Sequence, residues 1–449
     1  MANSPGANSP GANSPRPNSY DAIVVGAGVI GAAVGFELAK KGMKTLNLDK
    51  LPASGYGSTG ASCAIIRTYY STIDGCAIAY EAVFDWRRWA DYLGAADERG
   101  IAKFHETGVV LVIAGGSDRM SSIRRNMNAV GIAFEEWDAA TLKEKLPIYD
   151  LACYAPAKRP DDPGFAEPTG GEVEGAVYFP DGGYVSDPQL AAHNLQRAAE
   201  AHGGDFRFNA EVAEIRKSNG RVAGVTLRDG TAIDAPVIVN VAGPHSSIIN
   251  VMAGADAGMK IKTRALRHEV AHVPSPKGFD FEKNGYVVSD SDIAVYIRPE
   301  IGNHILIGSE DPECDPRDWV DPDDFNRDFT DQWTVQAQRA GQRIPTLGIP
   351  GQAKGVVDLY DVSDDWIPIY DKSDVPGFYL AIGTSGNQFK NAPVAGAMMA
   401  ALIEACEAGR DHDADPLQFK LKHIGRTIDV GFYSRRREVN QESSFSVLG

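Results

Sequence analysis

The sequence predicts an α/β fold in which a domain with a parallel, helix-covered sheet is combined with a second, α+β domain that has an antiparallel sheet. Three observations predict this fold. A buried strand, a glycine-rich turn, a helix and another strand follow one another at 20–50. Similar α/β stretches return at 184–250 and 377–408. The segments between them differ, because they contain aromatic-rich helices and strand-like runs.

The α/β stretches are taken in chain order. YDAIVVGAG reads as a buried strand, VIGAAVGFELAKKG as a helix closed by Gly42, and MKTLNLDK as a second strand. In the second stretch a helix begins at SDPQ, and two strands joined at Asn219-Gly220 precede the apolar strand APVIVNVAG. The third stretch, YLAIGTSGNQFKNAPVAG, is a strand, a turn and a helix that we expect Asn391 to cap.

The intervening segments predict the second domain. Residues 76–182 hold helices and the strand GVVLVIAG, and residues 263–353 hold the strands YVVSD, IAVYIRP and HILIGS and an acidic, helical region at 316–341. The first domain is then assembled from three separated stretches, 19–75, 183–262 and 354–449. Residues 1–18 contain the repeat ANSPG, ANSPG, ANSPR and are expected to be a disordered tail, because they have little to bury. We expect a ligand pocket between the two domains.

Composition limits the possible partners and compartment. The 449 residues carry a formal net charge of -16, which argues against nucleic acid or an anionic membrane as the main partner. The five cysteines are scattered without a C-x-x-C pair, which favours a reducing compartment and argues against a disulfide framework and a metal site such as zinc. No long apolar run and no signal-peptide pattern is present, so we expect a cytoplasmic protein without a membrane span.

A dinucleotide-binding signature opens the first domain. Gly26, Gly28 and Gly31 form the pattern G-x-G-x-x-G between a strand and a helix, and Asp49 ends the next strand. Such glycines allow a tight turn, close approach to a pyrophosphate and close helix packing, and the acid binds ribose hydroxyls. The long loop LPASGYGSTGASCAIIR then follows, and its small residues allow the chain to lie flat against a ring system. This loop favours FAD over NAD.

Four separated stretches make the chain similar to the FAD-dependent amine and amino-acid oxidoreductases typified by D-amino-acid oxidase, glycine oxidase and sarcosine oxidase. They are DAIVVGAGVIGAAVGFELAKKG with Asp49, GSTGASCAIIR, VIVNVAGPHS, and VVDLYDVSDDWIPIYD with YLAIGTSGNQFKNAPVAG. Within this family the chain most resembles monomeric sarcosine oxidase and the β subunit of the multi-subunit sarcosine oxidases. The resemblance implies a Rossmann-like FAD-binding domain beside a substrate-binding domain.

The resemblance also assigns residues to the cofactor. The ADP half would be held by Gly26, Gly28, Gly31, Asp49 and Lys50, the flavin loop would include Ser58 and Ser62, and the backbone of Val212 with Ala242 and Gly243 would lie along the cofactor. At the flavin ring we expect Gly383, Gly386, Asn387, Gln388, Phe389 and Lys390, followed by a helix whose positive N-terminal end faces the ring. Asp358 stands where monomeric sarcosine oxidase has its flavin-linked Cys, so non-covalent FAD is expected.

The substrate site is expected to be built around two cations. By resemblance, Arg67 and Lys390 hold the substrate carboxylate and are the expected catalytic residues, since such charges suit a carboxylate anchor. Further candidates for substrate binding are Arg298, His268, Glu310, Tyr286 and Tyr296. For each of these an ordinary role stays open: an ion-paired Arg, a core His, a solvated acidic loop, or core tyrosines.

The function expected from the resemblance is oxidation of the C–N bond of an amino acid or N-substituted glycine to an imine that hydrolyses, with O2 as acceptor and H2O2 as product. One alternative is an oxidase of specialised metabolism that cleaves a larger N-carboxyalkyl amine. Another is the FAD subunit of an amine or amino-acid dehydrogenase with a different acceptor, because Leu306 stands where monomeric sarcosine oxidase has its oxygen-activating Lys. Two roles stay open for the closing segment YSRRREVNQESSFSVLG: packing on the first domain or contacts in a homo-oligomer.

Overall fold

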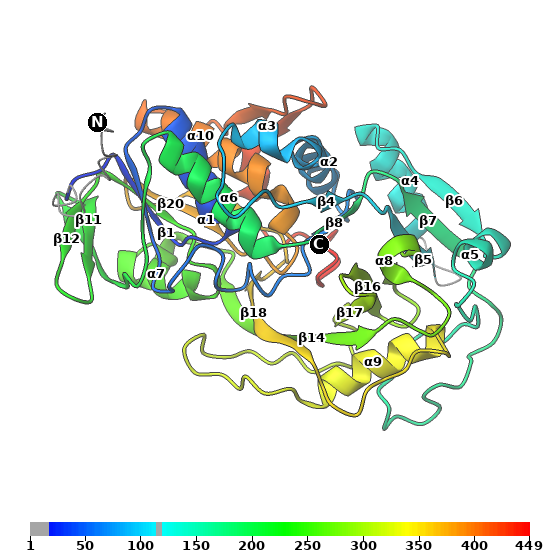
Figure 1. Ribbon diagram of the computed structural model, residues 1–449. Coiled ribbons are helices and arrows are strands. Elements are labelled where there is room, and N and C mark those ends of the chain that lie inside the picture. The colour runs from blue at the N-terminus through cyan, green and yellow to red at the C-terminus, as the bar shows by residue number, and fades with distance from the viewer. Residues whose placement is uncertain (1–17, 114–118) are drawn as a thin grey trace, which may run out of the picture.

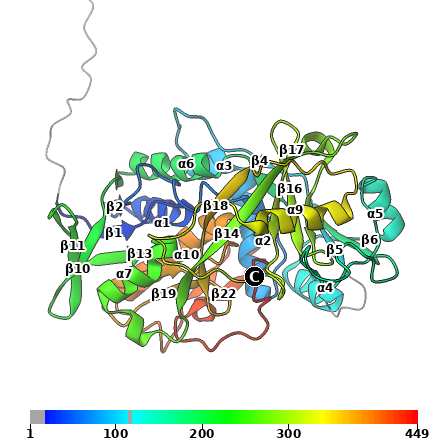
Figure 2. The same ribbon diagram turned by 90° about the horizontal axis from the view of Figure 1, so that it is seen from below.

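The computed structural model describes residues 18–113 and 119–449, so nearly all of the expected tail at 1–18 lies outside the described residues. Two large sheets organise the molecule, one on each side of its middle (Figure 1). In both views the C-terminal end lies at this middle, between the two parts (Figure 1, Figure 2). No helix within the described ranges is both long and apolar enough to cross a membrane.

The first sheet has six strands in the order β19-β20-β13-β1-β2-β9. Its strands are β1 (Ala22–Val25), β2 (Thr45–Leu48), β9 (Asp205–Arg207), β13 (Val237–Asn240), β19 (Ile369–Lys372) and β20 (Phe378–Ile382). All neighbours are parallel except β19, which runs antiparallel to β20. The inner strands β1, β2, β13 and β20 are mostly apolar and buried along their whole length, as strands covered on both faces must be.

Three helices cover one face of this sheet, with α1 packed between the other two (Figure 1). They are α1 (Val29–Lys40), α6 (Pro188–Ala201) and α10 (Ala392–Glu407). The expected start of α6 is confirmed, because the Asp187 side chain accepts a hydrogen bond from the Leu190 N–H at 2.8 Å. Asn391 stands at the N-cap position of α10, as expected, but its side chain makes no capping hydrogen bond. Its side chain donates instead to Gln388 Oε1 at 2.7 Å, because a short 3-10 turn at Phe389–Asn391 precedes the helix.

A small antiparallel sheet extends from this part of the molecule. It comprises β10 (Val212–Ser218), β11 (Arg221–Leu227) and β12 (Ala232–Asp234), and α7 (Ser246–Ala253) packs against it. Asn219 and Gly220, with φ of 50° and 80°, form the two-residue turn between the first two strands that the sequence predicts.

The second large sheet has eight strands in the order β18-β14-β17-β16-β15-β5-β7-β6. They are β5 (Val109–Ile113), β6 (Glu135–Asp138), β7 (Gly175–Phe179), β14 (Thr263–Pro274), β15 (Val287–Asp290), β16 (Val295–Glu300), β17 (His304–Ser309) and β18 (Gly355–Ser363). Neighbours are antiparallel except β5 and β15, which are parallel. Together the sheets confirm the predicted fold class of a Rossmann-like domain with a second α+β domain.

The remaining elements surround the two sheets. A three-stranded sheet contains β3 (Ile65–Ile66), β4 (Phe104–His105) and β8 (Gly183–Val185), and β21 (Gln418–Lys420) pairs with β22 (Thr427–Asp429). The other α-helices are α2 (Ile73–Arg87), α3 (Trp89–Leu93), α4 (Arg119–Val130), α5 (Ala139–Lys145), α8 (Phe281–Asn284) and α9 (Asp331–Arg343). The domain boundaries stay a prediction, and β18, although within 354–449, pairs along β14 of the eight-stranded sheet.

The helix expected over 316–341 is wrong in its first half, because α9 begins only at Asp331. Upstream, Asp and Asn side chains bond to their own backbone, as when Asp321 accepts from the Asp323 N–H at 2.9 Å. Pro322 also lacks the N–H that a helix interior needs. Residues 310–330 therefore form a loop, with Thr330 as the cap of α9.

Candidate active site

The glycine-rich turn fits a dinucleotide because two of its glycines leave no room for a side chain. Gly26 has a φ of 121°, and a Cβ there would lie 2.2 Å from the carbonyl oxygen of Val241. A Cβ on Gly31 would lie 2.4 Å from the carbonyl oxygen of Gly26. The turn is thus packed directly on the end of β13, next to Ala242, which places the predicted cofactor residues of both segments together.

Asp49 is fixed at the end of β2, as a ribose ligand should be. Its carboxylate accepts from the Ala27 N–H at 2.8 Å and from the Leu51 N–H at 2.9 Å. Burial raises the pKa of this carboxyl, and these two hydrogen bonds oppose the shift. The Ala210 N–H bonds to the carbonyl of Asp49, so Val212 at the start of β10 lies close by.

Lys50 lies at the same end of the sheet but has partners of its own. Its Nζ contacts His245 Nε2 at 2.8 Å and Asp323 Oδ1 at 2.5 Å. The same Asp323 oxygen lies 2.9 Å from His245, and hydrogen bonds from Lys50 and His245 lower the Asp323 pKa to about 2. The loop at 310–330 therefore reaches from the second part of the molecule to the ADP end of the expected cofactor site.

A cavity with about 820 Å³ of empty space, the part open to solvent included, lies where the flavin loop, the eight-stranded sheet and the turn at 383–391 meet. Its lining includes nine predicted residues: Ser58, Ser62, Arg67, His268, Tyr296, Gly386, Asn387, Phe389 and Lys390. Much of the remaining lining is apolar or aromatic: Ile65, Tyr69, Val270, Val287, Val288, Val356, Leu359, Tyr360, Val447 and Leu448. Such a pocket, largely apolar with a few polar groups, is typical of a small-molecule site.

Arg67 and Lys390 both line this cavity and both are buried, with exposed fractions of 5% and 3%. Lys390 Nζ donates to the Asn387 carbonyl at 2.7 Å and to the Tyr70 hydroxyl at 3.0 Å. Arg67 stacks on the Tyr70 ring, with its guanidinium carbon 4.1 Å from the ring centre. Neither cation forms an ion pair with a carboxylate in the described part of the chain.

Burial and the nearby Arg67 both disfavour the positive charge on Lys390. The pKa of Lys390 lies well below its usual range, first because burial disfavours the ammonium and second because Arg67 is near. Burial likewise raises the pKa of the Tyr70 hydroxyl to about 12, so Tyr70 stays a neutral partner of Lys390. A bound anion would relieve the repulsion between the two cations.

His268, on β14, also lines the cavity. Its ring stacks on Tyr360 with centroids 4.1 Å apart, and its Nε2 lies 3.1 Å from Asp311 Oδ1. Asp358 also lines the cavity, at the position where a flavin-linked Cys was considered. Cys63 faces the same space, and burial raises the pKa of its thiol, which makes it a weak nucleophile.

The structure does not bring three of the predicted substrate residues to the cavity lining. Arg298 pairs with Glu300 at 2.5 Å and packs on the Tyr184 ring, so its charge is compensated. Glu310 sits behind the lining, where it accepts a hydrogen bond from Ser289. Tyr286 packs edge-on against Trp137 and Tyr178 in the core of the second sheet.

Sequence reasoning missed several lining residues. Tyr360 follows two residues after Asp358, and alternation along β18 could have indicated it. Val447 and Leu448 carry no such signal, because their segment has no helix or strand periodicity. Gly383 and Gln388, both predicted at the flavin ring, lie just behind the lining, where Gly383 donates to the buried carboxylate of Asp361 at 2.6 Å.

Comparisons with known proteins agree with this geometry. The family model DAO, FAD dependent oxidoreductase, matches residues 21–402. Sarcosine oxidase subunit beta of Rhodobacter capsulatus is 27% identical over 85% of this chain and 84% of that protein. Glycine oxidase of Geobacillus kaustophilus is 25% identical over 90% of this chain and 98% of that protein.

Solved structures share the fold. L-proline dehydrogenase from P. horikoshii superposes with a TM-score of 0.72 at 20% identity and covers 93% of this chain and 97% of its own. Glycine oxidase from Geobacillus kaustophilus gives 0.69 at 20% identity, with coverage of 94% and 100%. The chain therefore belongs to the DAO family of FAD-dependent oxidoreductases that act on amines and amino acids, and its cofactor is FAD.

Proposed function

We propose that this enzyme oxidises an amine that carries a carboxylate, such as an amino acid or an N-substituted glycine, to an imine that water hydrolyses. One observation carries the proposal: Arg67 and Lys390 are buried side by side in the lining of one cavity, without a carboxylate partner among the described residues. Two such cations are costly unless an anion joins them. A substrate carboxylate is the anion that this pocket suits.

The residues of the chain would position the substrate rather than perform proton transfer. Arg67 and Lys390 would anchor the carboxylate, and the stacked rings of His268 and Tyr360 would form part of the wall and exclude water. When bound, FAD would supply the redox chemistry as the hydride acceptor. The N-terminus of α10, which follows directly after Lys390, adds a positive dipole end to this side of the site.

We also propose that FAD is bound without a covalent link. Asp358 offers no thiol for the thioether link, and Cys63 is a buried thiol with a raised pKa. Cys314 lies outside the cavity lining and donates to the Ala157 carbonyl at 3.2 Å. Denaturation in acid should therefore release all of the flavin into the supernatant, and flavin retained in the protein pellet would contradict this.

Two candidate functions, an oxidase and a dehydrogenase subunit, differ in the electron acceptor that reoxidises the flavin. Oxygen, with H2O2 as product, would match the relatives named as oxidases. A dehydrogenase subunit that passes electrons to another acceptor is favoured by Leu306, an apolar residue where monomeric sarcosine oxidase has its Lys. A similar structure named L-proline dehydrogenase and a relative named as a subunit also support this second candidate.

A larger N-carboxyalkyl amine is a further candidate substrate. The walls of the cavity are rich in aromatic and branched side chains, which suit a larger apolar substituent on the amine. A relative named N-methyl-L-tryptophan oxidase, from Yersinia pestis, is 26% identical over 49% of this chain. Such a substrate would bind the same two cations through its carboxylate.

The test is anaerobic reduction of the purified, FAD-loaded enzyme. Sarcosine, glycine, D-amino acids, iminodiacetate and N-carboxyalkyl amines would each be mixed with the protein while the flavin absorbance is followed. Each carboxylated amine is paired with its decarboxylated counterpart, such as dimethylamine for sarcosine. Bleaching by a carboxylated amine but not by its counterpart is expected, and failure across the whole panel would overturn the substrate class. Air is then admitted, and rapid reoxidation with H2O2 identifies an oxidase, whereas slow reoxidation identifies a dehydrogenase.

A further inference from the structure

The segment 443–449, here called the strap, lies at the middle of the molecule against the cavity (Figure 1, Figure 2). It has no helix or strand, and its only internal backbone hydrogen bond runs from the Gly449 N–H to the Ser446 carbonyl at 3.0 Å. Even so, Ser443, Ser446 and Val447 are buried. Buried backbone without regular structure is held by the groups around it.

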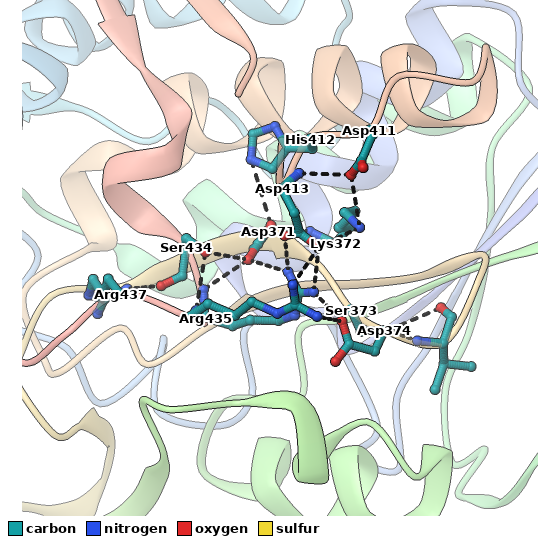
Figure 3. Close-up of polar contacts among 12 residues, drawn as sticks. Asp371, Lys372, Ser373, Asp374, Asp411, His412, Asp413, Ser434, Arg435 and Arg437 are labelled. Carbon is teal, nitrogen blue, oxygen red and sulfur yellow. Dashed lines mark hydrogen bonds and ion pairs between the residues drawn. The ribbon is translucent and has the colours of Figure 1, made fainter. Parts of the chain in front are cut away.

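The root of the strap is fixed by a buried ion cluster (Figure 3). Arg435 is fully buried and pairs with Asp371 at 2.9 Å and with both carboxylate oxygens of Asp413 at 2.9 and 3.0 Å. Arg437 makes a two-point contact with Asp365 at 2.7 and 2.9 Å. These contacts pack the start of the closing segment on the first domain, one of the two roles open for it, and anchor the chain before the strap begins.

The strap itself is tied down by polar contacts to the rim of the cavity. Arg317 donates to the Phe445 carbonyl at 2.7 Å, and the Val447 N–H donates to Asp311 at 3.3 Å. Ser71 donates from its hydroxyl to the main-chain oxygen of Gly449 at 2.6 Å. The Val447 side chain packs in a small apolar cluster that also contains Tyr296.

The decisive contact is with Arg67. Its Nη2 donates to the Val447 carbonyl at 3.0 Å and to the Leu448 carbonyl at 2.8 Å, and its Nη1 donates to the Tyr69 carbonyl. Two parallel hydrogen bonds to a carboxylate need either the Nη1–Nη2 edge or the Nε–Nη2 edge of a guanidinium. Both edges require a hydrogen on Nη2, and the strap already accepts both Nη2 hydrogens.

We propose that the strap and the substrate carboxylate compete for Arg67, so that withdrawal of the strap is a step in substrate binding. The proposal rests on the proposed function, since it requires that Arg67 binds the carboxylate. The strap is suited to withdraw because it forms no sheet or helix hydrogen bonds that would have to break. Its ion-paired root stays in place and keeps it near the cavity. Substrate selection then depends on the strap as well as on the cavity wall.

The test measures binding of methylthioacetate, a thioether carboxylate that cannot be oxidised as an amine, to the FAD-loaded protein through the change in flavin absorbance. Three proteins are compared with the full chain: one that ends at residue 442, Arg317→Ala, and Arg228→Ala as an exposed control. If the strap is open in about 10% of molecules, its removal lowers the Kd about 10-fold. Arg317→Ala should lower the Kd in the same direction by a smaller factor, and Arg228→Ala should leave it unchanged.

Hydrogen exchange of the unmodified protein gives an independent readout. Methylthioacetate should speed exchange in a peptide that contains Val447 and Gly449 while slowing it in peptides that line the cavity. If the Kd is the same with and without the strap, or higher after the strap is removed, the competition is refuted, but binding of a carboxylate at Arg67 and Lys390 is not. No binding to any of the proteins would overturn the carboxylate site and the competition together. If the shortened protein does not fold, Arg317→Ala and the exchange experiment still decide between these outcomes.

Discussion

Replacing Lys390 with Met removes one of the two cations while keeping most of the side-chain volume. In the structure the Lys390 Nζ bonds to the Asn387 carbonyl and the Tyr70 hydroxyl, which leaves its last N–H for the cavity. A hydrogen bond from such an ammonium to a substrate carboxylate contributes about 1.5–3 kcal/mol. The substitution should therefore raise KM for carboxylated amines about 10- to 100-fold, because 1.4 kcal/mol corresponds to about a factor of ten.

The assay is stopped-flow reduction of the flavin over a range of substrate concentrations, with FAD affinity and Tm measured in parallel. Lys283→Met serves as the matched control, because this lysine is 79% exposed and is not part of the cavity lining. The control should match the unmodified enzyme in every readout. An unchanged KM in Lys390→Met, or an equal loss with the decarboxylated amine, would refute the role of Lys390 as a carboxylate anchor.

Three further predictions follow from the ionisable groups. Burial and Arg67 lower the pKa of Lys390, and a bound carboxylate should raise it again. The affinity for methylthioacetate should therefore fall as pH rises. In a titration across pH, Lys390→Met should flatten this dependence. Burial raises the pKa of Asp361 from 3.8 to about 7, so this carboxyl lowers the stability of the fold as pH rises through that window. Asp361→Asn should therefore raise Tm at pH 8 but not at pH 4. An equal rise in Tm at both pH values would contradict this. Arg435→Ala should lower the free energy of unfolding by about 3–5 kcal/mol in urea denaturation, because buried Asp371 loses its partner. Its half-exposed neighbour gives the matched control, since Arg436→Ala should cost less than about 1 kcal/mol.

The parts of the site that local sequence patterns encode were predictable. The glycine turn and Asp49 could be found because strand, turn and helix each leave a short-range signal. Arg67 and Lys390 were identified by resemblance, and the structure places both in one cavity. Arg298 was expected to bind substrate, yet Glu300 lies two residues on, on the same face of β16, where the pair neutralises itself.

The parts that were not predictable depend on contacts between distant segments. Val447 reaches the cavity only because the chain is anchored elsewhere, at Arg435 and Arg437, and no periodicity marks this. The loop at 310–330 was expected to be partly helical because it is acidic and polar, but side-chain bonds to its own backbone compete with a helix. In both cases the local sequence is compatible with several conformations, and tertiary contacts select one.

The ion cluster around Arg435 has a consequence for how this enzyme can change (Figure 3). Because the chain is fixed there by side chains, the residues beyond Arg437 add no strand to either large sheet, and side-chain contacts such as that of Val447 with Tyr296 are what constrain their identity. Many other lining residues lie in strands of the eight-stranded sheet, where a substitution also alters the packing of that sheet. Val447 and Leu448 lie in no strand, and they offer a route by which substrate preference can diverge while stability is preserved.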